Sequence, residues 1–488
     1  MSGSRVLLCF CLLAAIRVWL YAAAFPFFNN VDEIAHLDLV IKYSQGEIPT
    51  KLETMSDQTV KLVVTYMSPE YITTPETYKG KGMPRPRWKQ WNGQINKGDS
   101  ALINYLLQLP NHEASSAPLY YAMAGAWLTF GSAIMTWAVE GHQMYWIRFL
   151  NVIFAVLLVW LAYRCAEEIP GTNRHAVWAV TGLAALMPQD AFYAVQSDVL
   201  SPVCFGFAFL FLIRFVRADV PPGRLGLFLG IAVASTVLVK TSNLPLILLM
   251  TAMVIFKAYR LKKQQQLRAA RPALLKFFLF AWIPLVCWMT WNYQVFGDVF
   301  ASEEKIRHLG WTHKPLSDWL DNSMLTFERT GLFWREIMVT FWRGELIFHL
   351  KRVAFPVLDV LFWLSSLIFL VLALVTRGII SDGLLRMATR WSFVLLIVYI
   401  IVLSLMFDYG SCGYPSRLMP FFSSGRLLWG ALIPFTLLYV GGYNFLFSWI
   451  RNLNVRYLLF WLILISVTIT EAMISIPVFE SRYNFFHM

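Results

Sequence analysis

The sequence predicts an all-α protein that crosses a membrane many times. Hydrophobic residues make up 58% of its 488 residues and charged residues only 14%, whereas about 25% of the residues of a soluble protein are charged. Apolar runs of about 17–25 residues, enough to span a hydrocarbon core of about 30 Å, recur along the chain. Aromatic residues, 16% of the total, occur at the ends of many runs, as in interfacial belts. We therefore expect a single membrane domain over residues 1–488.

Twelve apolar runs are candidates for membrane spans. The first is not expected to be a cleaved signal, because Arg17 interrupts it and no small-residue cleavage site is evident. We expect it to be a retained span that starts in the cytoplasm. The runs cover residues 6–25, 118–139, 145–163, 175–194, 199–216, 225–241, 243–258, 275–294, 355–376, 391–407, 426–447 and 457–476.

Basic loops decide the predicted topology. Residues 257–276 contain seven Lys or Arg and no acid, and the positive-inside bias places such a loop in the cytoplasm. If all twelve runs crossed the membrane, this loop would lie outside. The conflict disappears if run 118–139 is an interface-lying or re-entrant helix of the first outside loop. We therefore predict about eleven spans, with a cytoplasmic N-terminus and an extracytoplasmic C-terminus.

Two large outside loops follow from this topology, at residues 26–144 and 295–354, and we expect interface helices in the first. A smaller outside loop, residues 407–426, is rich in Gly, Pro and Ser. The net charge of +12 falls mostly in short cytoplasmic loops, so binding to nucleic acid is not expected. The six cysteines have neither metal-type spacing nor an evident disulfide framework.

The first outside loop opens with an acidic pair and a histidine. Asp32 and Glu33 follow Asn30, a candidate N-cap, and Glu33 at the third helical position would complete a capping box. His36 lies one turn from Asp32 on the same helical face. A first-turn acid also stabilises the helix dipole. That structural role explains the acids but not their place beside a histidine at a membrane exit, so Asp32 and Glu33 are candidate catalytic residues.

Other polar residues are predicted on the same side of the membrane. His112 and Glu113 precede a helix that starts at Pro118, which ordinary loop polarity would also explain. Asp198 lies near membrane depth, where an ionisable group is costly and usually functional, although it could be only the N-cap of the next span. Asp190 lies in the same turn.

Three cations are expected beside these acids. Lys240 ends a span on the outside, against the positive-inside bias, and could simply snorkel to the interface. Arg417 and Arg426 lie in the last outside loop, and arginine is suited to bidentate contact with phosphate. The cations and carboxylates together predict a site for a lipid-linked phosphate and a hydroxyl-bearing acceptor. No P-loop, dinucleotide fingerprint or metal-type His/Cys cluster is present, so nucleotide-driven chemistry is not indicated.

Four motifs occur in order along the chain: Asp32-Glu33-x-x-His36 with Gly46-Glu47-Ile48-Pro49, His112-Glu113 with Pro118-Leu119-Tyr120-Tyr121, Ser197-Asp198-Val199-Leu200, and Trp288-x-x-x-Asn292 with Gly297-Asp298. In order and spacing, over most of the chain, they resemble the GT-C superfamily of polytopic glycosyltransferases, in the branch of bacterial protein O-mannosyltransferases and aminoarabinose transferases. Ala117 stands where that branch usually has a proline, and the absence of a large C-terminal soluble domain argues against the oligosaccharyltransferase branch.

The resemblance implies a multi-pass enzyme of the plasma (inner) membrane that transfers a hexosyl or pentosyl unit, with inversion, from a polyprenyl-phosphate sugar to a glycan, lipid or protein. Asp32 or Glu33 would be the general base. Lys240, Arg417 and Arg426 would stabilise the leaving phosphate, and His36, His112, Glu113 and Asp198 would help to bind substrates. No metal ligand is assigned and no cofactor is required, although a divalent cation is left open. Membrane lipids complete the expected partners.

Two other functions remain open. A transporter or flippase of a lipid-linked glycan would have repeated halves with broken spans at matching positions, and the sequence has none that are evident. A non-catalytic assembly protein of the cell envelope would not need paired acids at the membrane face.

Overall fold

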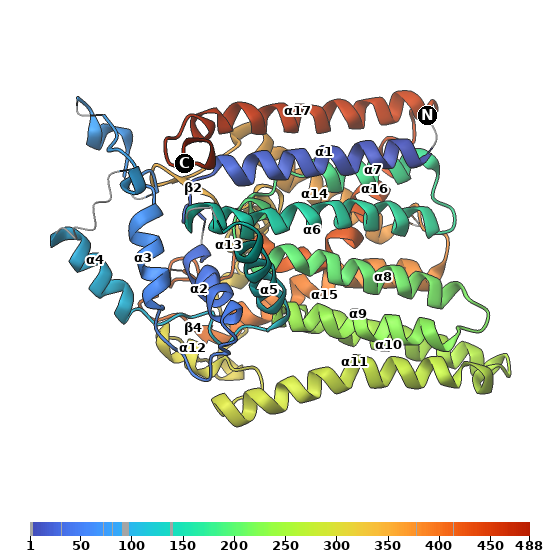
Figure 1. Cartoon of the computed structure of the whole chain (residues 1–488). Coiled ribbons are helices and arrows are strands. Elements are labelled where there is room, and N and C mark those ends of the chain that lie inside the picture. The colour runs from blue at the N-terminus through green and yellow to red at the C-terminus, as the bar shows by residue number, and fades with distance from the viewer. Residues whose placement is uncertain are drawn as a thin grey trace.

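The chain forms a bundle of long helices with a smaller layer of helices and loops at one end (Figure 1). The computed structural model describes residues 3–30, 32–71, 73–80, 82–89, 97–136, 140–376, 378–412 and 414–488. Nine helical segments in these ranges are long and apolar enough to cross a membrane. They are α1 (Gly3–Ala24), α6 (Glu140–Glu168), η4 with α8 (Ser197–Arg217), η5 with α10 (Thr241–Lys263), α11 (Leu267–Phe296), α14 (Pro356–Val375), α15 (Gly383–Met406), η8 with α16 (Gly425–Leu446) and α17 (Leu453–Phe479).

The two remaining predicted spans are also helices, but shorter ones. α9 (Gly223–Val239) has 17 residues and α7 (Arg174–Leu186) has 13. Both run along the bundle beside the longer helices (Figure 1). α7 ends at Leu186 because the chain turns there, just before Pro188, and continues as a buried segment with two 3-10 turns, η3 (Asp190–Tyr193) and η4 (Ser197–Leu200). The apolar run 175–194 is therefore a short helix followed by a turn that lies inside the protein.

The run that was not expected to span forms α5 (Leu119–Ile134), which lies across the end of the bundle (Figure 1). It packs against α2 (Glu33–Ser44), and the contact is close: a Cβ atom at Gly125 would lie 2.9 Å from the backbone nitrogen of Ser44. That this helix lies at the membrane interface stays a prediction. Residues 137–139 of the run lie outside the described residues.

The end layer contains both large loops predicted from the sequence. Figure 1 places α2 to α5, α12, β4 and the C-terminus at one end of the bundle and the N-terminus at the other. The basic loops between α6 and α7, α8 and α9, and α10 and α11 lie at the N-terminal end. The remaining elements are α3 (Asp57–Tyr66), α4 (Lys97–Gln108), α12 (Glu303–His308), α13 (Phe327–Arg343), β1 (Thr312–His313) paired with β4 (Phe407–Asp408), β2 (Ile347–Phe348) paired with β3 (Lys351–Arg352), and the 3-10 turns η1 (Pro75–Tyr78), η2 (Arg87–Lys89), η6 (Leu316–Asp318), η7 (Ser323–Leu325) and η9 (Phe485–His487).

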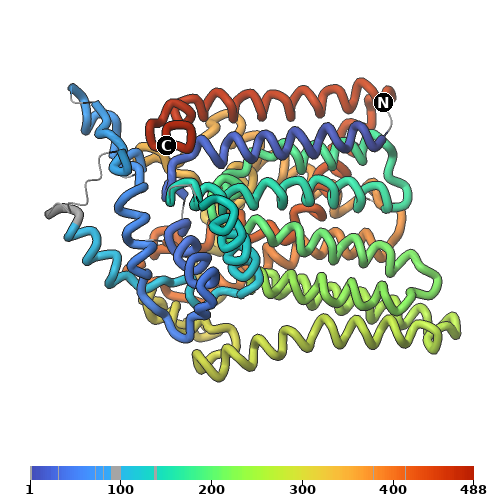
Figure 2. The backbone as a smooth tube through the Cα atoms, viewed as in Figure 1, coloured from blue at the N-terminus to red at the C-terminus, as the bar shows by residue number. Residues whose placement is uncertain are grey.

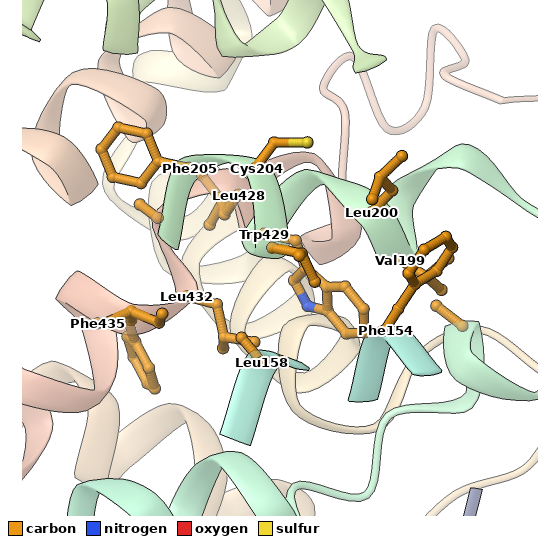
Figure 3. Close-up of a cluster of buried hydrophobic side chains, with 14 of the residues drawn as sticks. Phe154, Leu158, Val199, Leu200, Cys204, Phe205, Leu428, Trp429, Leu432 and Phe435 are labelled. Atoms are coloured by element: carbon orange, nitrogen blue, oxygen red, sulfur yellow. The ribbon is translucent and has the colours of Figure 1, made fainter. Parts of the chain in front are cut away.

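Buried contacts hold the helices in place. The first and last helices run side by side in Figure 2, and the Nη2 atom of Arg17 in α1 lies 2.7 Å from the Oε1 atom of Glu471 in α17. Close to the end layer, Trp429 of η8 is fully buried among side chains of α6, η4 and α8 (Figure 3). Its ring centroid is 5.2 Å from that of Phe192 in η3. This packing fixes η4 and η8 relative to each other.

Single cysteines at Gln264 and Ser411 test the topology, because both positions are exposed and lie at opposite ends of the bundle. In a variant without the six native cysteines, a membrane-impermeant maleimide should label the Ser411→Cys protein in intact cells and not the Gln264→Cys protein. Lysis should make both reactive. Labelling at position 264 before lysis would contradict the predicted orientation.

Candidate functional site

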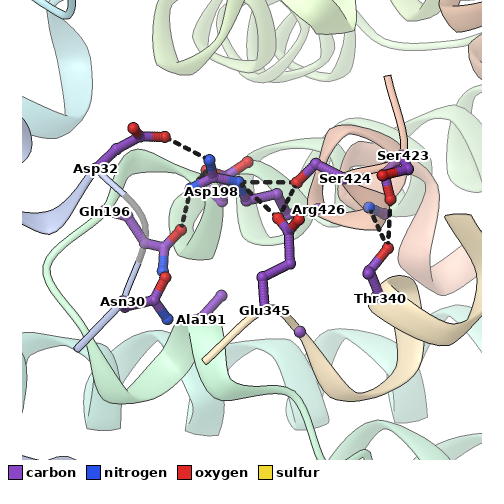
Figure 4. Close-up of polar contacts among 12 residues, drawn as sticks. Asn30, Asp32, Ala191, Gln196, Asp198, Thr340, Glu345, Ser423, Ser424 and Arg426 are labelled. Atoms are coloured by element: carbon purple, nitrogen blue, oxygen red, sulfur yellow. Dashed lines mark hydrogen bonds and ion pairs between the residues drawn. The ribbon is translucent and has the colours of Figure 1, made fainter. Parts of the chain in front are cut away.

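Side chains from four distant segments meet in one cluster, and Figure 4 shows Asp32, Asp198 and Arg426 of it. Asp32 is the residue before α2, Asp198 lies in η4, Lys240 directly follows α9, and Arg426 lies in η8. The backbone of Asp32 has a φ of 66°, in the left-handed region that non-glycine residues seldom adopt. The structure therefore brings together four of the residues that the sequence singles out.

Arg426 is the centre of this cluster and is surrounded by three carboxylates. Its Nη2 atom is 2.6 Å from Oδ2 of Asp32, its Nη1 atom is 3.9 Å from Oδ2 of Asp198, and its Nε atom is 3.7 Å from Oε2 of Glu345. The Arg426 guanidinium also donates hydrogen bonds to Oε1 of Gln196 at 2.9 Å and to Oγ of Ser424 at 3.0 Å. A second cation lies alongside, because Lys240 forms an ion pair with Asp198.

Asp32 is the accessible carboxylate of the cluster. Its side chain is 24% exposed, whereas those of Asp198 and Glu345 are 1% and 7% exposed. Its Oδ1 atom lies 3.2 Å from Nε2 of His112. Burial alone would raise the pKa of Asp32, but the hydrogen bond from His112 and the charge of Arg426 hold this pKa well below its usual value. Asp32 is therefore a carboxylate at neutral pH.

Glu113 extends the cluster toward the second loop. Its Oε1 atom lies 2.9 Å from Nζ of Lys305 in α12 and 3.7 Å from Nε2 of His112, and it accepts a hydrogen bond from Ser116. Burial would raise the pKa of Glu113, but the charge of Lys305 and the two nearby histidines lower it overall. The backbone nitrogen of Leu52 donates to Oε2 of Glu304 at 3.0 Å. α12 thus connects the two large loops beside the site.

Glu33 lies apart from Asp32 although the two are adjacent in sequence. Its side chain is 1% exposed and pairs with Arg148 of α6 at 2.7 Å and 2.8 Å. Its two carboxylate oxygens also accept hydrogen bonds from the backbone nitrogens of Phe28 and Val195, both at 2.9 Å. Both carboxylate oxygens of Glu33 therefore have structural partners, and neither oxygen faces the Asp32 cluster.

Two other buried acid–base groups border the site. His36 is buried, its Nδ1 atom lies 2.7 Å from the hydroxyl of Tyr121, and burial lowers its pKa to about 4, so the ring is neutral at pH 7. Asp190 accepts hydrogen bonds from the backbone nitrogen of Leu346 and from Asn30. Burial is the largest cause that raises the pKa of Asp190, to about 7.

Arg417 is not part of the Asp32 cluster. Its side chain is 71% exposed and its Nε atom lies 3.3 Å from Oδ1 of Asp408, in a separate pocket. In the described part of the chain, no group of three or more His, Cys, Asp and Glu side chains could hold a metal ion. Around Arg426, the carboxylates of Asp32, Asp198 and Glu345 are paired with the cations of Arg426 and Lys240.

An apolar groove opens beside Glu113. It has a volume of about 270 Å³ and lies between the 114–118 turn, the end of α2 and the last turns of α11. Ser116, the partner of Glu113, lines it. Its other lining residues are Tyr43, Ile48, Pro49, Ala114, Ser115, Pro118, Trp288, Trp291, Asn292 and Phe296.

Sequence reasoning missed four residues that hold this arrangement: Arg148, Gln196, Lys305 and Glu345. Arg148 is a single charged residue within an apolar run of the sequence. A charge at membrane depth is the signal that could have identified it. Glu345 and Lys305 are charged residues in the second outside loop, where no periodic pattern distinguishes them from surface residues. Gln196 lies in the same turn as Asp198.

Comparisons with known proteins give a family and a distant structural likeness. Residues 15–413 match the model of the family described as "Predicted membrane protein (DUF2142)". No curated protein matches the chain. The crystal structure of the Archaeoglobus fulgidus oligosaccharyltransferase, in complex with Zn and sulfate, is similar with a TM-score of 0.46 and 10% identity. The likeness covers 96% of this chain and 53% of that one, so the chain spans about half the length of the archaeal protein.

Proposed function

The chain belongs to the DUF2142 family of predicted membrane proteins, and we propose that it is a glycosyltransferase that uses a polyprenyl-phosphate sugar at the extracytoplasmic face. The observation that supports this most is the contact between Asp32 and Arg426. An accessible carboxylate, 24% exposed, touches a guanidinium that also faces two buried carboxylates. The site thus combines a base with a binding position for phosphate. The branch of bacterial O-mannosyl- and aminoarabinose transferases, suggested by the motifs, remains part of the proposal.

The proposed reaction uses each charged group once. Asp32 accepts the proton of an acceptor hydroxyl while the hydroxyl oxygen attacks the anomeric carbon of the donor sugar. The bond between that carbon and the phosphate oxygen breaks, and the configuration inverts. Arg426 and Lys240 stabilise the negative charge on the departing polyprenyl phosphate. His112 orients Asp32, and Glu113 holds α12 in place through Lys305.

The lipid part of the donor would lie in the apolar groove beside Glu113. The groove is lined by Trp288, Trp291 and Phe296, which lie near the end of the long helix α11. Tryptophan side chains commonly lie at the level of lipid headgroups. An isoprenoid chain in this groove would extend into the membrane while its phosphate reached the cations of the site.

The glycans of the cell envelope can be analysed directly for the product of the proposed reaction. We expect one sugar substituent to be missing from the envelope of cells that lack this chain and to return when the wild-type gene is restored. The donor lipid should accumulate in the mutant cells, which mass spectrometry of extracted lipids would detect. Identical glycan and lipid profiles with and without the chain would contradict the proposal.

Replacing His112 with alanine should shift the pH dependence of transfer. Burial would raise the pKa of Asp32. The hydrogen bond from His112 is the largest of the effects that lower this pKa. Losing this bond raises the pKa of Asp32, so protonation removes the base at a higher pH. The acid limb of the kcat/KM profile should therefore move to higher pH. The profile has to extend well below the usual pKa of an aspartate, because the pKa of Asp32 in the wild type lies well below that value. Replacing His308, an exposed histidine of α12, is the control and should leave the limb in place.

A further inference from the structure

A second polar pocket lies on the same end of the molecule as Asp32. It has a volume of about 450 Å³, within the roughly 300–1,000 Å³ range of small-molecule sites. It forms between the segment that follows β1 and the loop that follows β4, and the pairing of Thr312 with Asp408 holds the two together. Its polar lining includes Lys314, Asp318, Asp321, Asn322, Asp408 and Arg417.

One loop connects this pocket to the Asp32 cluster. The loop leaves the pocket at Pro420 and reaches Ser424, which hydrogen-bonds both Glu345 and Arg426. The hydroxyl of Tyr414, in the middle of the loop, lies 3.0 Å from Oγ of Ser423. Figure 1 places β4 and α12 at the same end of the bundle as α2, so the pocket and the cluster lie at the same end of the molecule. An extended molecule could therefore occupy both.

The lining limits the chemistry of the ligand. Three carboxylates, of Asp318, Asp321 and Asp408, and two cations, of Lys314 and Arg417, line it, so its walls offer both acceptors and donors of hydrogen bonds. The walls are too polar for a lipid chain. Carboxylates accept hydrogen bonds, and ammonium, guanidinium and amide groups donate them. A neutral ligand whose hydroxyl groups both donate and accept matches these walls.

Asn322 gives an independent sign of a missing partner. The residue is 6% exposed, and its Oδ1 atom accepts a hydrogen bond from the backbone nitrogen of Met324 at 3.0 Å. Its Nδ2 atom is buried and has no hydrogen-bond partner in the described structure. Buried donors are nearly always paired. A ligand oxygen in the pocket that Asn322 lines would provide the acceptor.

We propose that this pocket binds a sugar unit of a neutral oligosaccharide acceptor, at a distance from the unit that receives the new sugar beside Asp32. The proposal rests on the proposed function and names its acceptor class. It also explains Arg417, which the sequence predicts to be a phosphate ligand but which the structure places in this pocket with Asp408. The acceptor is then a glycan of several units rather than a single sugar.

Acceptor kinetics test this assignment. The donor is the lipid fraction, labelled in its sugar, from cells that lack this chain, and the acceptor is the envelope glycan from the same cells. The double variant Asn322→Leu, Asp408→Asn should raise the KM for the glycan by at least tenfold, with a change of less than twofold in the KM for the donor lipid. The Asp57→Asn variant, which changes an exposed acid of α3 on the same face, is the matched control. An unchanged KM for the glycan, or equal changes in both KM values, would overturn the proposal.

Direct binding separates failure of this inference from failure of the proposed function. Wild-type protein in nanodiscs, mixed with the same glycan fraction, should retain glycan on co-sedimentation, and the double variant should not. The Asp32→Asn protein should still retain it. If the wild type transfers no sugar yet binds glycan through the pocket, the inference stands and the transfer proposal fails. If neither wild type nor variant retains glycan, the inference fails.

Discussion

Replacing Asp32 with asparagine is expected to lower the rate of sugar transfer by about 10²–10⁴-fold, the range that a positioned general base contributes. Asparagine keeps the size of the side chain and its carbonyl oxygen can still accept from Arg426, so the site should stay assembled. The amide cannot take the proton of the attacking hydroxyl. The measurement is the initial rate of transfer by equal amounts of purified, membrane-inserted protein.

Two controls make the Asp32 result interpretable. Asp57→Asn makes the same chemical change at an exposed position of the end layer and should retain full activity. Asp32→Asn protein should also melt within a few degrees of the wild type, because the residue is partly exposed. Transfer by Asp32→Asn at more than half the wild-type rate would show that Asp32 is not the base.

Replacing Glu33 with glutamine is expected to destabilise the fold by about 3–5 kcal/mol, the usual cost of breaking one side of a buried ion pair. The guanidinium of Arg148 is 1% exposed, and Glu33 is its carboxylate partner. Without that charge, Arg148 stays buried and unneutralised between α1, α6 and the start of α2. Thermal unfolding in detergent, followed by near-ultraviolet circular dichroism, should show a large fall in Tm.

A double variant distinguishes this structural role from a catalytic one. Adding Arg148→Met to Glu33→Gln removes the stranded charge and should recover part of the lost stability, since contacting residues couple. If Glu33 were the catalytic base instead, Glu33→Gln would fold and melt like the wild type but transfer no sugar. That outcome would assign the base to Glu33 and contradict the geometry seen here.

Hydropathy and charge predict most of the fold because both depend on local sequence alone. Nine of the eleven expected spans are helices long and apolar enough to cross a membrane, two are shorter helices, and the reassigned run forms α5 across the end of the bundle. The exceptions are instructive. α7 stops at Leu186, just before Pro188, and the following segment is a turn buried in the protein interior. Composition alone does not separate a buried turn from the rest of an apolar span.

The sequence predicts on which side of the membrane the site residues lie, but it does not predict where each side chain points. Asp32, Asp198, Lys240 and Arg426 share one end of the bundle, as the topology predicts, and they also touch one another. Glu33 shares that end too. Glu33 is the first residue of α2, whereas Asp32 precedes the helix with a left-handed φ of 66°, so Glu33 faces Arg148 while Asp32 faces Arg426.

Loop residues were the hardest to place. Arg417 and Arg426 belong to one loop and carry the same charge, yet only Arg426 is anchored in a helical turn, by the burial of Trp429. Glu345 reaches the cluster because α13 ends at Arg343 and the chain reverses at Gly344. Such placements depend on packing between segments more than 80 residues apart, which no local pattern encodes.

Transfer in a reconstituted system tests the central claim most directly. Purified protein would be placed in liposomes with sugar-labelled polyprenyl-phosphate lipid and the envelope glycan from cells that lack this chain. We predict that label moves from the lipid to the glycan, with one polyprenyl phosphate released for each sugar transferred, and that Asp32→Asn protein moves none. Movement of the intact labelled lipid between leaflets without cleavage would instead show a transporter and contradict the account.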